Sequence, residues 1–407
     1  MSTAEPRISL VMIAKDEQAN LPRALESAAR FVDEIVLVDT GSTDRTVQIA
    51  EGYGAKVYHH PWQGDFSLHR NQALSYAGGD WCLQLDADEA LDPAGGPLLR
   101  ELAAAPEVMA YWVTIENVFS TGERTSFRWP RFFRRHPQVR YTRRVHNVLE
   151  VPGPVQPSTL RILHYGYDGD QSHRQARRLA MIRQWAAQEP DNWEAHYYLA
   201  QTLVAQPETV DEAVREALRS LELARGAGVT DPRQLSRIYL PLAQGLNILA
   251  RHHESLKHCG AWAALVPIHP DPYLYLGRAQ YALEMLEDAC RSLEIFCRLH
   301  GRYRDTPAAL HGFEVKTQGL IYSALVIWLV AEWRLGRRQR ALNLFEACLE
   351  QPRAEEVCAL AAEHAQEKGC PDLARELARI AAQRNPHWPW PQRLISPQGD
   401  PHQTLAG

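Results

Sequence analysis

EIVLVDTGSTDRTVQIAEGYGAKVYHH, residues 34–60, is the stretch that decides the fold of the first half of the chain. Its apolar, β-branched run 34–39 predicts a buried strand, 44–53 predicts a helix, and 55–60 predicts a second strand. A strand, a helix and a strand joined by short turns are typical of a parallel sheet covered by helices on both faces.

The same alternation continues on both sides of this unit. Amphipathic segments at 17–30 and 66–77 predict two more helices. An Arg-rich, β-like region extends to about residue 164. We therefore predict a Rossmann-like α/β domain with a mostly parallel sheet over residues 1–171. Its further strands are predicted in the runs ISLVMIA (8–14), WCLQLD (81–86) and YWVTIEN (111–117).

The second half of the chain has a different character. Strand signals disappear beyond residue 172, and helical periodicity continues to about residue 385. Blocks 190–203 and 270–283 are similar, because each places aromatics and leucines on one helical face after a proline, and a second helix follows each. A third copy is predicted in 331–350. We therefore predict an all-α domain over residues 172–385 that resembles tetratricopeptide (TPR) repeats.

Three small residues, Ala200, Gly277 and Gly336, are expected at helix crossings of this domain, where they would let antiparallel helices approach closely. The tail, residues 386–407, is rich in proline and is expected to be incompatible with a helix. It either wraps the last helix through Trp388 and Trp390 or is loose.

Composition and charge argue against a disordered, a nucleic-acid-binding and a disulfide-linked protein. The chain has 407 residues, of which 45% are hydrophobic and 23% charged, as is ordinary for a folded globular protein. A net charge of -5 gives no reason to expect nucleic acid as a partner. The seven cysteines form no CxxC pair and are expected to be reduced.

We expect no membrane span and no signal peptide. The longest apolar stretch, 320–333, contains Ser323 and Glu332 and is shorter than the ~20 residues that cross a bilayer. The apolar run near the N-terminus ends in the charged triplet KDE, residues 15–17, which is unlike a signal peptide. The expected location is the cytoplasm.

A first candidate site lies in VDTGSTD, residues 38–44, where the second predicted strand ends. Ligands of open α/β sheets bind at the carboxyl ends of strands, and an acid there can accept hydrogen bonds from a nucleotide. Asp39 is therefore a candidate for nucleotide binding, while Ser42 and Asp44 are expected to cap the following helix. The alternative is a capped helix without a ligand.

A second candidate site is DADE, residues 86–89, which follows another buried strand. Alternation in an extended segment would point Asp86 and Asp88 to the same side, where two carboxylates repel unless a cation lies between them. Hard oxygen ligands suit Mg2+ or Mn2+, which can bridge a diphosphate. Arg70 and Asn71 lie between the two sites in the sequence.

Three segments that hold these motifs resemble the nucleotide-sugar domain of family 2 glycosyltransferases with the GT-A fold. The resemblance covers about the first 170 residues, and the motifs occur in the order of that family. It is strongest to a subgroup with a helical repeat region after the catalytic domain, near the sublancin-type peptide S-glycosyltransferases. The segments are ISLVMIAKDEQANLPRAL (8–25), VDEIVLVDTGSTDRTVQIAEGYGAKV (32–57) and HRNQALSYAGGDWCLQLDADEAL (69–91).

The resemblance implies roles for several of these residues. Asp39 would contact the nucleobase, Asp86 the ribose or metal, and Asp88 the metal. The donor would be a UDP-sugar, with Mn2+ or Mg2+ as cofactor, and Lys15, Glu17 and Arg70 would lie near the nucleotide. His164 would bind the metal opposite the diphosphate; the alternative is a histidine with a purely structural role at the domain boundary.

The sequence offers two candidates for the catalytic base. Relatives are expected to have His-Glu where this chain has His146 and Asn147, and an amide cannot accept a proton. Either His146 or Glu150 is the base, or the acceptor is a thiolate that needs little help, or the transfer activity has been lost.

Eight arginines between residues 124 and 144 are expected mainly to form a solvated basic face, with one or two reaching the ligand. They are Arg124, Arg128, Arg131, Arg134, Arg135, Arg140, Arg143 and Arg144.

The leading hypothesis is an inverting, metal-dependent transfer of a sugar from a nucleotide-diphosphate sugar to a peptide, protein or glycan acceptor. The helical domain would present a peptide-binding or partner-binding face, or would form a homodimer. The first alternative is a TPR-type interaction protein that binds nucleotide-sugar without catalysis. A nucleotidyltransferase is a third hypothesis, which lacks the support of a Gly-rich triphosphate loop.

Overall fold

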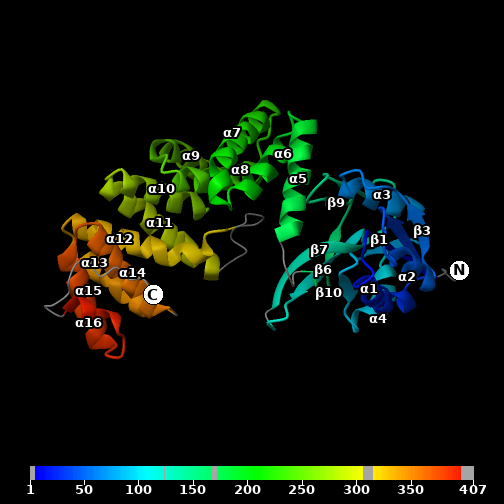
Figure 1. The fold of residues 1–407 in the computed structure, drawn as a ribbon, viewed down its shortest axis with the longest axis horizontal. Helices are drawn as coiled ribbons and strands as arrows, with labels where there is room; N and C mark the ends of the chain where they lie inside the picture. Colours follow the sequence, from blue (N-terminus) through cyan, green and yellow to red (C-terminus); the bar gives the residue numbers. More distant parts are fainter. Residues whose placement is uncertain (1–4, 123, 167–171, 306–314, 352, 396–407) are drawn as a thin grey trace. The chain divides into compact units, whose positions relative to one another are not determined.

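The computed structural model describes residues 5–122, 124–166, 172–305, 315–351 and 353–395. The chain forms two compact units, residues 1–185 and 186–407 (Figure 1). The boundary that we predicted between residues 171 and 172 stays a prediction, since residues 167–171 lie outside the described part.

The first unit is built on an eight-stranded sheet with the strand order β3-β2-β1-β4-β7-β6-β10-β5. β1 is parallel to β2 and β4, β2 to β3, and β6 to β10, whereas β7 and β5 are antiparallel to their neighbours. A separate antiparallel pair, β8 and β9, follows β7. The expected mostly parallel α/β sheet is confirmed. The strands are β1 Ile8–Ala14, β2 Glu34–Asp39, β3 Lys56–His59, β4 Trp81–Gln84, β5 Glu89–Leu91, β6 Ala110–Val118, β7 Arg124–Arg134, β8 Arg140–Thr142, β9 Val148–Glu150 and β10 Val155–His164.

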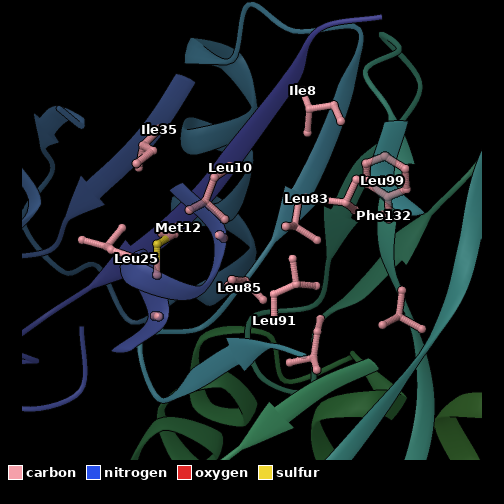
Figure 2. Packing of buried hydrophobic residues seen from close by; sticks show 14 of the residues in the cluster. Ile8, Leu10, Met12, Leu25, Ile35, Leu83, Leu85, Leu91, Leu99 and Phe132 are labelled. Carbon is pink, nitrogen blue, oxygen red and sulfur yellow. The ribbon is translucent and has the colours of Figure 1, made fainter. Parts of the chain in front are cut away.

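Both faces of this sheet are covered. On one face, Leu10 of β1 and Leu83 of β4 pack with Leu25 and Leu99 from two helices, as Figure 2 shows. On the other face, Val11 and Val38 pack against α3 and the β8–β9 pair. This alternation of inward side chains explains why β1 and β2 are apolar along nearly their whole length. The helices are α1 Leu21–Ala28, η1 Ala29–Phe31, α2 Thr46–Gly52, α3 Phe66–Tyr76, α4 Gly95–Ala103 and α5 Ser172–Gln188.

The bounds of some predicted elements shift. The helix that we predicted over 17–30 begins only at Leu21, with Pro22 in its first turn, where a missing N–H is tolerated. The strand that we predicted over 81–86 ends at Gln84. We expected Ser42 and Asp44 to cap α2, but its N-cap residue is Arg45, without a side-chain cap bond. Asp44 accepts a hydrogen bond from the N–H of Thr46 at 2.9 Å, and Ser42 Oγ instead accepts one from the N–H of Asp16 at 3.0 Å.

The second unit consists of helices in its described residues, which confirms the all-α prediction. The repeat-like blocks correspond to the pairs α6–α7 and α10–α11, and the apolar stretch 320–333 is largely α12. No helix in the described ranges is long and apolar enough to cross a membrane. The helices are α6 Trp193–Leu203, η2 Pro207–Thr209, α7 Val210–Gly226, α8 Pro232–Ile248, α9 His252–Leu265, α10 Asp271–Ala282, α11 Leu286–Asp305, η4 Gln318–Leu320, α12 Ile321–Arg334, α13 Arg338–Leu349, α14 Ala354–Glu367, α15 Pro371–Arg384 and α16 Trp390–Ile395.

Two details of this unit differ from expectation. Gly277 does lie at a close helix crossing, because a Cβ there would come within 2.8 Å of Leu293. Gly336 does not: it ends α12 with a φ of 76° and has open space around it. The expectation that the tail excludes a helix is wrong for residues 390–395, because Pro391 falls in the first turn of α16. Trp388 and Trp390 pack against the core of the last helices.

Candidate functional site

The carboxyl ends of several strands meet at one edge of the sheet. β1, β2 and β4 are parallel and end at Ala14, Asp39 and Gln84. β7 is antiparallel to both β4 and β6, so β6 and its parallel neighbour β10 run in the same direction as β4. His164, the last residue of β10, therefore lies at the same edge as the DADE segment. Ligands of open α/β sheets bind at such an edge.

The loops that follow β1 and β2 are bonded to each other. The carboxylate of Asp16 accepts a hydrogen bond from the N–H of Thr43 at 2.7 Å, and the N–H of Glu17 donates to Thr46 Oγ1 at 2.7 Å. Lys15 is exposed beside them. The structure thus brings Lys15 and Glu17 next to the loop after β2, where the sequence analysis expected the nucleotide.

Asp39 is buried at the end of β2. Its carboxylate accepts hydrogen bonds from the N–H groups of Gly41 and Ser42 at 3.2 and 3.1 Å and lies 3.2 Å from His59 Nδ1. The φ of 106° at Gly41 lets the loop fold back over the carboxylate. Burial opposes ionisation, but the bonds to Ser42, His59 and Gly41 keep the pKa of Asp39 below its ordinary value. The base of the loop is therefore anionic at neutral pH.

The DADE segment is a turn. The N–H of Glu89 donates to the carbonyl of Asp86 at 3.0 Å, and the chain turns at Ala87 and Asp88 before β5 begins. The expectation of an extended segment is therefore wrong, while the placement of the two carboxylates on one side stays a prediction. Asp86 and Asp88 have different partners.

Two guanidinium groups hold Asp86. Its Oδ1 lies 2.6 Å from Arg70 Nη2 and its Oδ2 lies 3.2 Å from Arg131 Nη2. Burial opposes ionisation of Asp86, but the two arginines hold the pKa of this carboxyl well below its usual range. The structure thus brings the predicted residues Asp86 and Arg70 together. Whether Asp86 contacts ribose or metal stays a prediction.

Arg131 and Glu89 belong to this cluster, although the sequence analysis gave neither an individual role. Arg131 Nη2 lies 2.7 Å from Glu89 Oε1, and Glu89 Oε2 accepts a hydrogen bond from the N–H of Asp86 at 2.8 Å. Burial raises the pKa of Glu89 to about 7, although Arg131 opposes this rise. Glu89 and Arg131 together hold the turn on which Asp86 and Asp88 lie.

Asp88 faces His164. The distance between Asp88 Oδ2 and His164 Nε2 is 3.5 Å, and the N–H of Tyr165 donates to the carbonyl of Asp88 at 2.9 Å. A Cβ on Gly166 would lie 2.7 Å from His164 Nε2 and closer still to Asp88 Oδ2. Burial opposes the charged imidazole, but Asp88 raises the pKa of His164 above its ordinary value. Only glycine at 166 therefore fits without displacing Asp88 or His164.

This pair of atoms fits a hard divalent cation. A carboxylate oxygen is a ligand of both Mn2+ and Mg2+, whereas an imidazole nitrogen suits Mn2+ better. Mg2+ commonly takes one or two carboxylates and completes its shell with phosphate oxygens and water. Over the described ranges, no group of three or more His, Cys, Asp or Glu residues is placed to hold a metal. A cation between Asp88 and His164 would therefore need oxygens from a bound phosphate or from water.

The candidate base residues lie on or next to the β8–β9 pair. His146 is exposed in the loop between these strands, with a φ of 53°, and Asn147 is half-buried. Glu150 lies on β9 and pairs with Arg140 at 2.8 Å, both side chains being largely exposed. This ion pair gives Glu150 a structural partner, and its role as base stays a prediction.

Helix α3 connects this loop to the acidic cluster. Asn71 donates to the carbonyl of Tyr141 at 2.8 Å and accepts from its N–H at 2.7 Å, and Ser67 donates to the carbonyl of Arg143 at 2.5 Å. Arg70, on the same helix, pairs with Asp86. One helix therefore positions both the acidic cluster and the loop that carries His146 and Asn147.

The Arg-rich region is largely accessible to solvent: Arg124, Arg128, Arg135 and Arg140 are exposed, and Arg131 is buried. Arg124 and Arg140 pair with Glu116 and Glu150. Arg134 and Arg135 donate to backbone carbonyls, including that of Gly79, while Arg131 is buried in the site. The ion pairs of Arg124 and Arg140 lie at the surface, where such pairs contribute little to stability, whereas Arg131 reaches the acidic cluster.

Comparison with known proteins identifies one family model and several similar proteins. Residues 9–163 match the family model described as Glycosyl transferase family 2. A TPR repeat-containing protein of Synechococcus elongatus is 37% identical over 212 residues, which cover 47% of this chain and 51% of that protein. The SPbeta prophage-derived glycosyltransferase SunS of Bacillus subtilis is 24% identical over 201 residues, covering 46% of this chain and 47% of that protein. The chain thus spans about half the length of these relatives.

Among solved structures, the chain is similar to glucosyl-3-phosphoglycerate synthase from Mycobacterium tuberculosis in complex with Mn2+ and UDP-glucose. The identity is 24%, the match covers 29% of this chain and 45% of that one, and the TM-score is 0.24.

Proposed function

Because residues 9–163 match the family model described as Glycosyl transferase family 2, we propose that this chain is an inverting glycosyltransferase. It would move a sugar from a nucleotide-diphosphate sugar, with UDP-sugars as the leading donors, to a peptide, protein or glycan acceptor. The acceptor nucleophile attacks the anomeric carbon in line, opposite the departing diphosphate, and no covalent intermediate on the protein is needed.

One observation carries this proposal: the anionic Asp39, the Asp86–Arg70–Arg131 cluster and the Asp88–His164 pair converge on one edge of the sheet. Burying several carboxylates at one edge costs free energy, since each must be desolvated and paired. Such clusters are typical of functional sites, and this one suits the binding of a diphosphate with a cation. A side chain at residue 166 would displace Asp88 or His164, so glycine is needed there for these two groups to face each other.

The residues of the chain divide the work as follows. Asp39 would accept a hydrogen bond from the nucleobase, and Asp88 with His164 would hold Mn2+ or Mg2+. A cation there would neutralise the charge that develops on the diphosphate as it departs. Arg70 and Arg131 keep Asp86 ionised and oriented, and would leave it as an acceptor for the ribose hydroxyls or as a further metal ligand.

The amide of Asn147 cannot act as the base, so the need for another base depends on the acceptor. For an alcohol acceptor, His146 or Glu150 would be the base, and Glu150 would first have to leave Arg140. For a thiol acceptor, ionisation near neutral pH makes a base unnecessary. The helical unit is the part of the chain that would recognise a peptide or protein acceptor.

A screen of nucleotide-sugars by thermal shift, with Mn2+ and with EDTA, tests the donor. A ligand present at about 100 times its Kd stabilises the native state by about 2.7 kcal/mol, which is readily measured. We expect stabilisation by one nucleotide-sugar in Mn2+ and its loss in EDTA. No stabilisation by any nucleotide-sugar would contradict the proposal.

The alternative, an interaction protein that binds nucleotide-sugar without catalysis, is favoured by Asn147 and by the TPR repeat-containing relative. Donor hydrolysis distinguishes the two functions. Once the bound nucleotide-sugar is known, slow metal-dependent release of free sugar supports the transferase. Tight binding with neither hydrolysis nor transfer to any peptide, protein or glycan tested supports the interaction protein.

A further inference from the structure

The even-numbered helices α6, α8, α10 and α12 form one layer of the helical unit. α6 packs against α8, α8 against α10, and α10 against α12, in addition to the helices next to them in the chain. The odd-numbered helices α7, α9 and α11 contact one another less. Because helices approach each other more closely on the inner side of a curved array, the even-numbered helices are its inner layer.

Two arginines each join two helices of this inner layer. Arg237 of α8 donates to Tyr198 Oη of α6 at 3.0 Å, and Arg278 of α10 donates to Ser323 Oγ of α12. Both arginines are half-buried, so part of each side chain is accessible to a ligand. Since α8 packs against α10, the two arginines belong to neighbouring helices of one layer.

The sides of α8 and α10 that hold these arginines face each other. Gln244 lies at position i+7 from Arg237 on α8, and Tyr275 lies at position i-3 from Arg278 on α10. Such positions share one side of a helix. Gln244 is hydrogen-bonded to Tyr275. The two arginines therefore lie on the adjoining sides of two packed helices.

Arg237 and Arg278 lack the carboxylate partner that other half-buried arginines have. Among the residues that the structure describes, neither forms an ion pair with an acid; Arg237 lies over tyrosine rings and Arg278 contacts Ser323. Burial lowers the pKa of Arg278 below its ordinary value, and the opposing effect comes from Tyr275. The other half-buried arginines described in the helical unit pair with acids: Arg251 with Glu254, Arg334 with Glu284 and Arg337 with Glu287.

A partly desolvated cation costs free energy unless an anion compensates it. The planar guanidinium group suits carboxylates in particular, because it can donate two parallel, charge-assisted hydrogen bonds to them. Two such cations on neighbouring helices are therefore complementary in charge to a chain that carries several carboxylates.

We propose that the inner layer of the helical unit binds an acidic peptide segment, with Arg237 and Arg278 each contacting one of its carboxylates. The inference deepens the proposed function, on which the assignment of this segment to the acceptor rests. Binding of the segment is a property of the helical unit and does not depend on the sugar donor.

The probe is a fluorescein-labelled peptide of alternating glutamate and alanine, and its uncharged counterpart has glutamine in place of glutamate. Binding to the full chain is measured by fluorescence anisotropy at low salt, without nucleotide or metal. The wild type should bind the glutamate peptide and bind the glutamine peptide at least about tenfold more weakly. This comparison needs no variant.

Three variants then locate the site, after their melting temperatures show that they are folded. Arg237→Gln and Arg278→Gln remove the charge but keep a donor, and Arg278→Lys keeps the charge. Arg298→Gln is the matched control, because Arg298 is exposed on the odd-numbered helix α11.

Each glutamine variant at the site should bind the glutamate peptide about tenfold more weakly than the wild type, as expected for the loss of a charge-assisted hydrogen bond. Arg278→Lys should lose less affinity than Arg278→Gln, and Arg298→Gln should bind like the wild type.

The inference is overturned if the wild type binds neither peptide or binds both equally, or if Arg298→Gln loses as much affinity as the two site variants. Stronger displacement of the probe by a single-stranded oligonucleotide than by unlabelled glutamate peptide overturns the assignment to a peptide. If the glutamate peptide binds through both arginines but no nucleotide-sugar stabilises the protein, the proposed function fails while the peptide site stands.

Discussion

Replacing Arg131 by methionine should destabilise the first unit strongly and in a pH-dependent way. Arg131 lies 2.7 Å from Glu89 and 3.2 Å from Asp86, and its side chain and that of Glu89 are 10% and 3% exposed. Methionine fills similar space but leaves the Glu89 carboxylate buried without its cation. Removing one partner of a buried ion pair typically costs about 3–5 kcal/mol. For a unit of 185 residues this corresponds to a fall in melting temperature of about 6–20 °C.

The sign of the pH dependence follows from Glu89. Burial raises the pKa of Glu89 from its ordinary value of 4.5 to about 7. Between these two pH values the folded protein binds a proton that the unfolded chain has released, so the stability falls as the pH rises from about 4.5 to about 7. Without Arg131 the pKa of Glu89 rises further. The stability deficit of the variant should therefore grow with rising pH, by up to about 1.4 kcal/mol per pH unit, between the Glu89 pKa of the wild type and that of the variant. Asp86, whose pKa is lowered, stays ionised over this range.

The assay is calorimetric unfolding of wild type and variant between about pH 6 and about pH 9. Arg128→Met, at an exposed position on the same strand, is the matched control and should change stability by no more than about 0.5 kcal/mol. Adding Glu89→Gln to Arg131→Met should recover part of the loss and remove its pH dependence. A deficit no larger than that of Arg128→Met, or one independent of pH, would refute the assignment of a buried Arg131–Glu89 pair.

Three further predictions concern the site and the unit that carries it. Gly166→Ala should lower the Mn2+-dependent affinity for UDP by about tenfold or more while the protein stays folded, because the added Cβ would lie between Asp88 and His164. Unchanged affinity in calorimetry would show that the metal does not bind between these two side chains. If the base has been lost, Asn147→Glu should raise donor hydrolysis or transfer by about 10²–10⁴-fold in a sugar-release assay, whereas loss of an existing transfer activity would make Asn147 itself a contributor. Residues 1–188, which include all of α5, should bind the same donor as the full chain in a thermal shift assay; a folded fragment that binds none would place part of the donor site in the helical unit.

Much of the fold could be predicted from the sequence because its strands are short, buried and nearly continuous apolar runs. The predicted bounds of β1 and β2 coincide with the structure. Helix ends were less accurate: the segment 17–20 has helical periodicity, but its backbone bonds to the loop after β2 instead of continuing α1. The short helix α16 was missed because a proline was treated as an interruption where it lies in a first turn.

The acids of the site could be predicted because Asp39 and Asp86 follow buried strands closely, and parallel strands bring their carboxyl ends together. The residues that contact these acids could not be predicted from the sequence. Arg131 reaches Asp86 only because β7 is antiparallel to β4, and Asn117 reaches His164 only through the pairing of β6 with β10. Such pairings join residues far apart in the chain, and local periodicity does not specify which strands become neighbours. Leu83 pairs with Phe132, and Arg131 precedes Phe132 in the chain. Had this register been known, it would have indicated that Arg131 lies near the end of β4, close to Asp86.

The metal-dependent binding of a nucleotide diphosphate is the property that follows most directly from the Asp88–His164 pair. It is measured by calorimetric titration of UDP into wild type and Asp88→Asn, each in Mn2+ and in EDTA. We predict binding by the wild type in Mn2+, its loss in EDTA, and a fall in affinity of about tenfold or more in Asp88→Asn without a change in fold, because the substitution removes an anionic ligand but little packing. Equally tight, EDTA-insensitive binding of UDP by both proteins would contradict a metal site at Asp88.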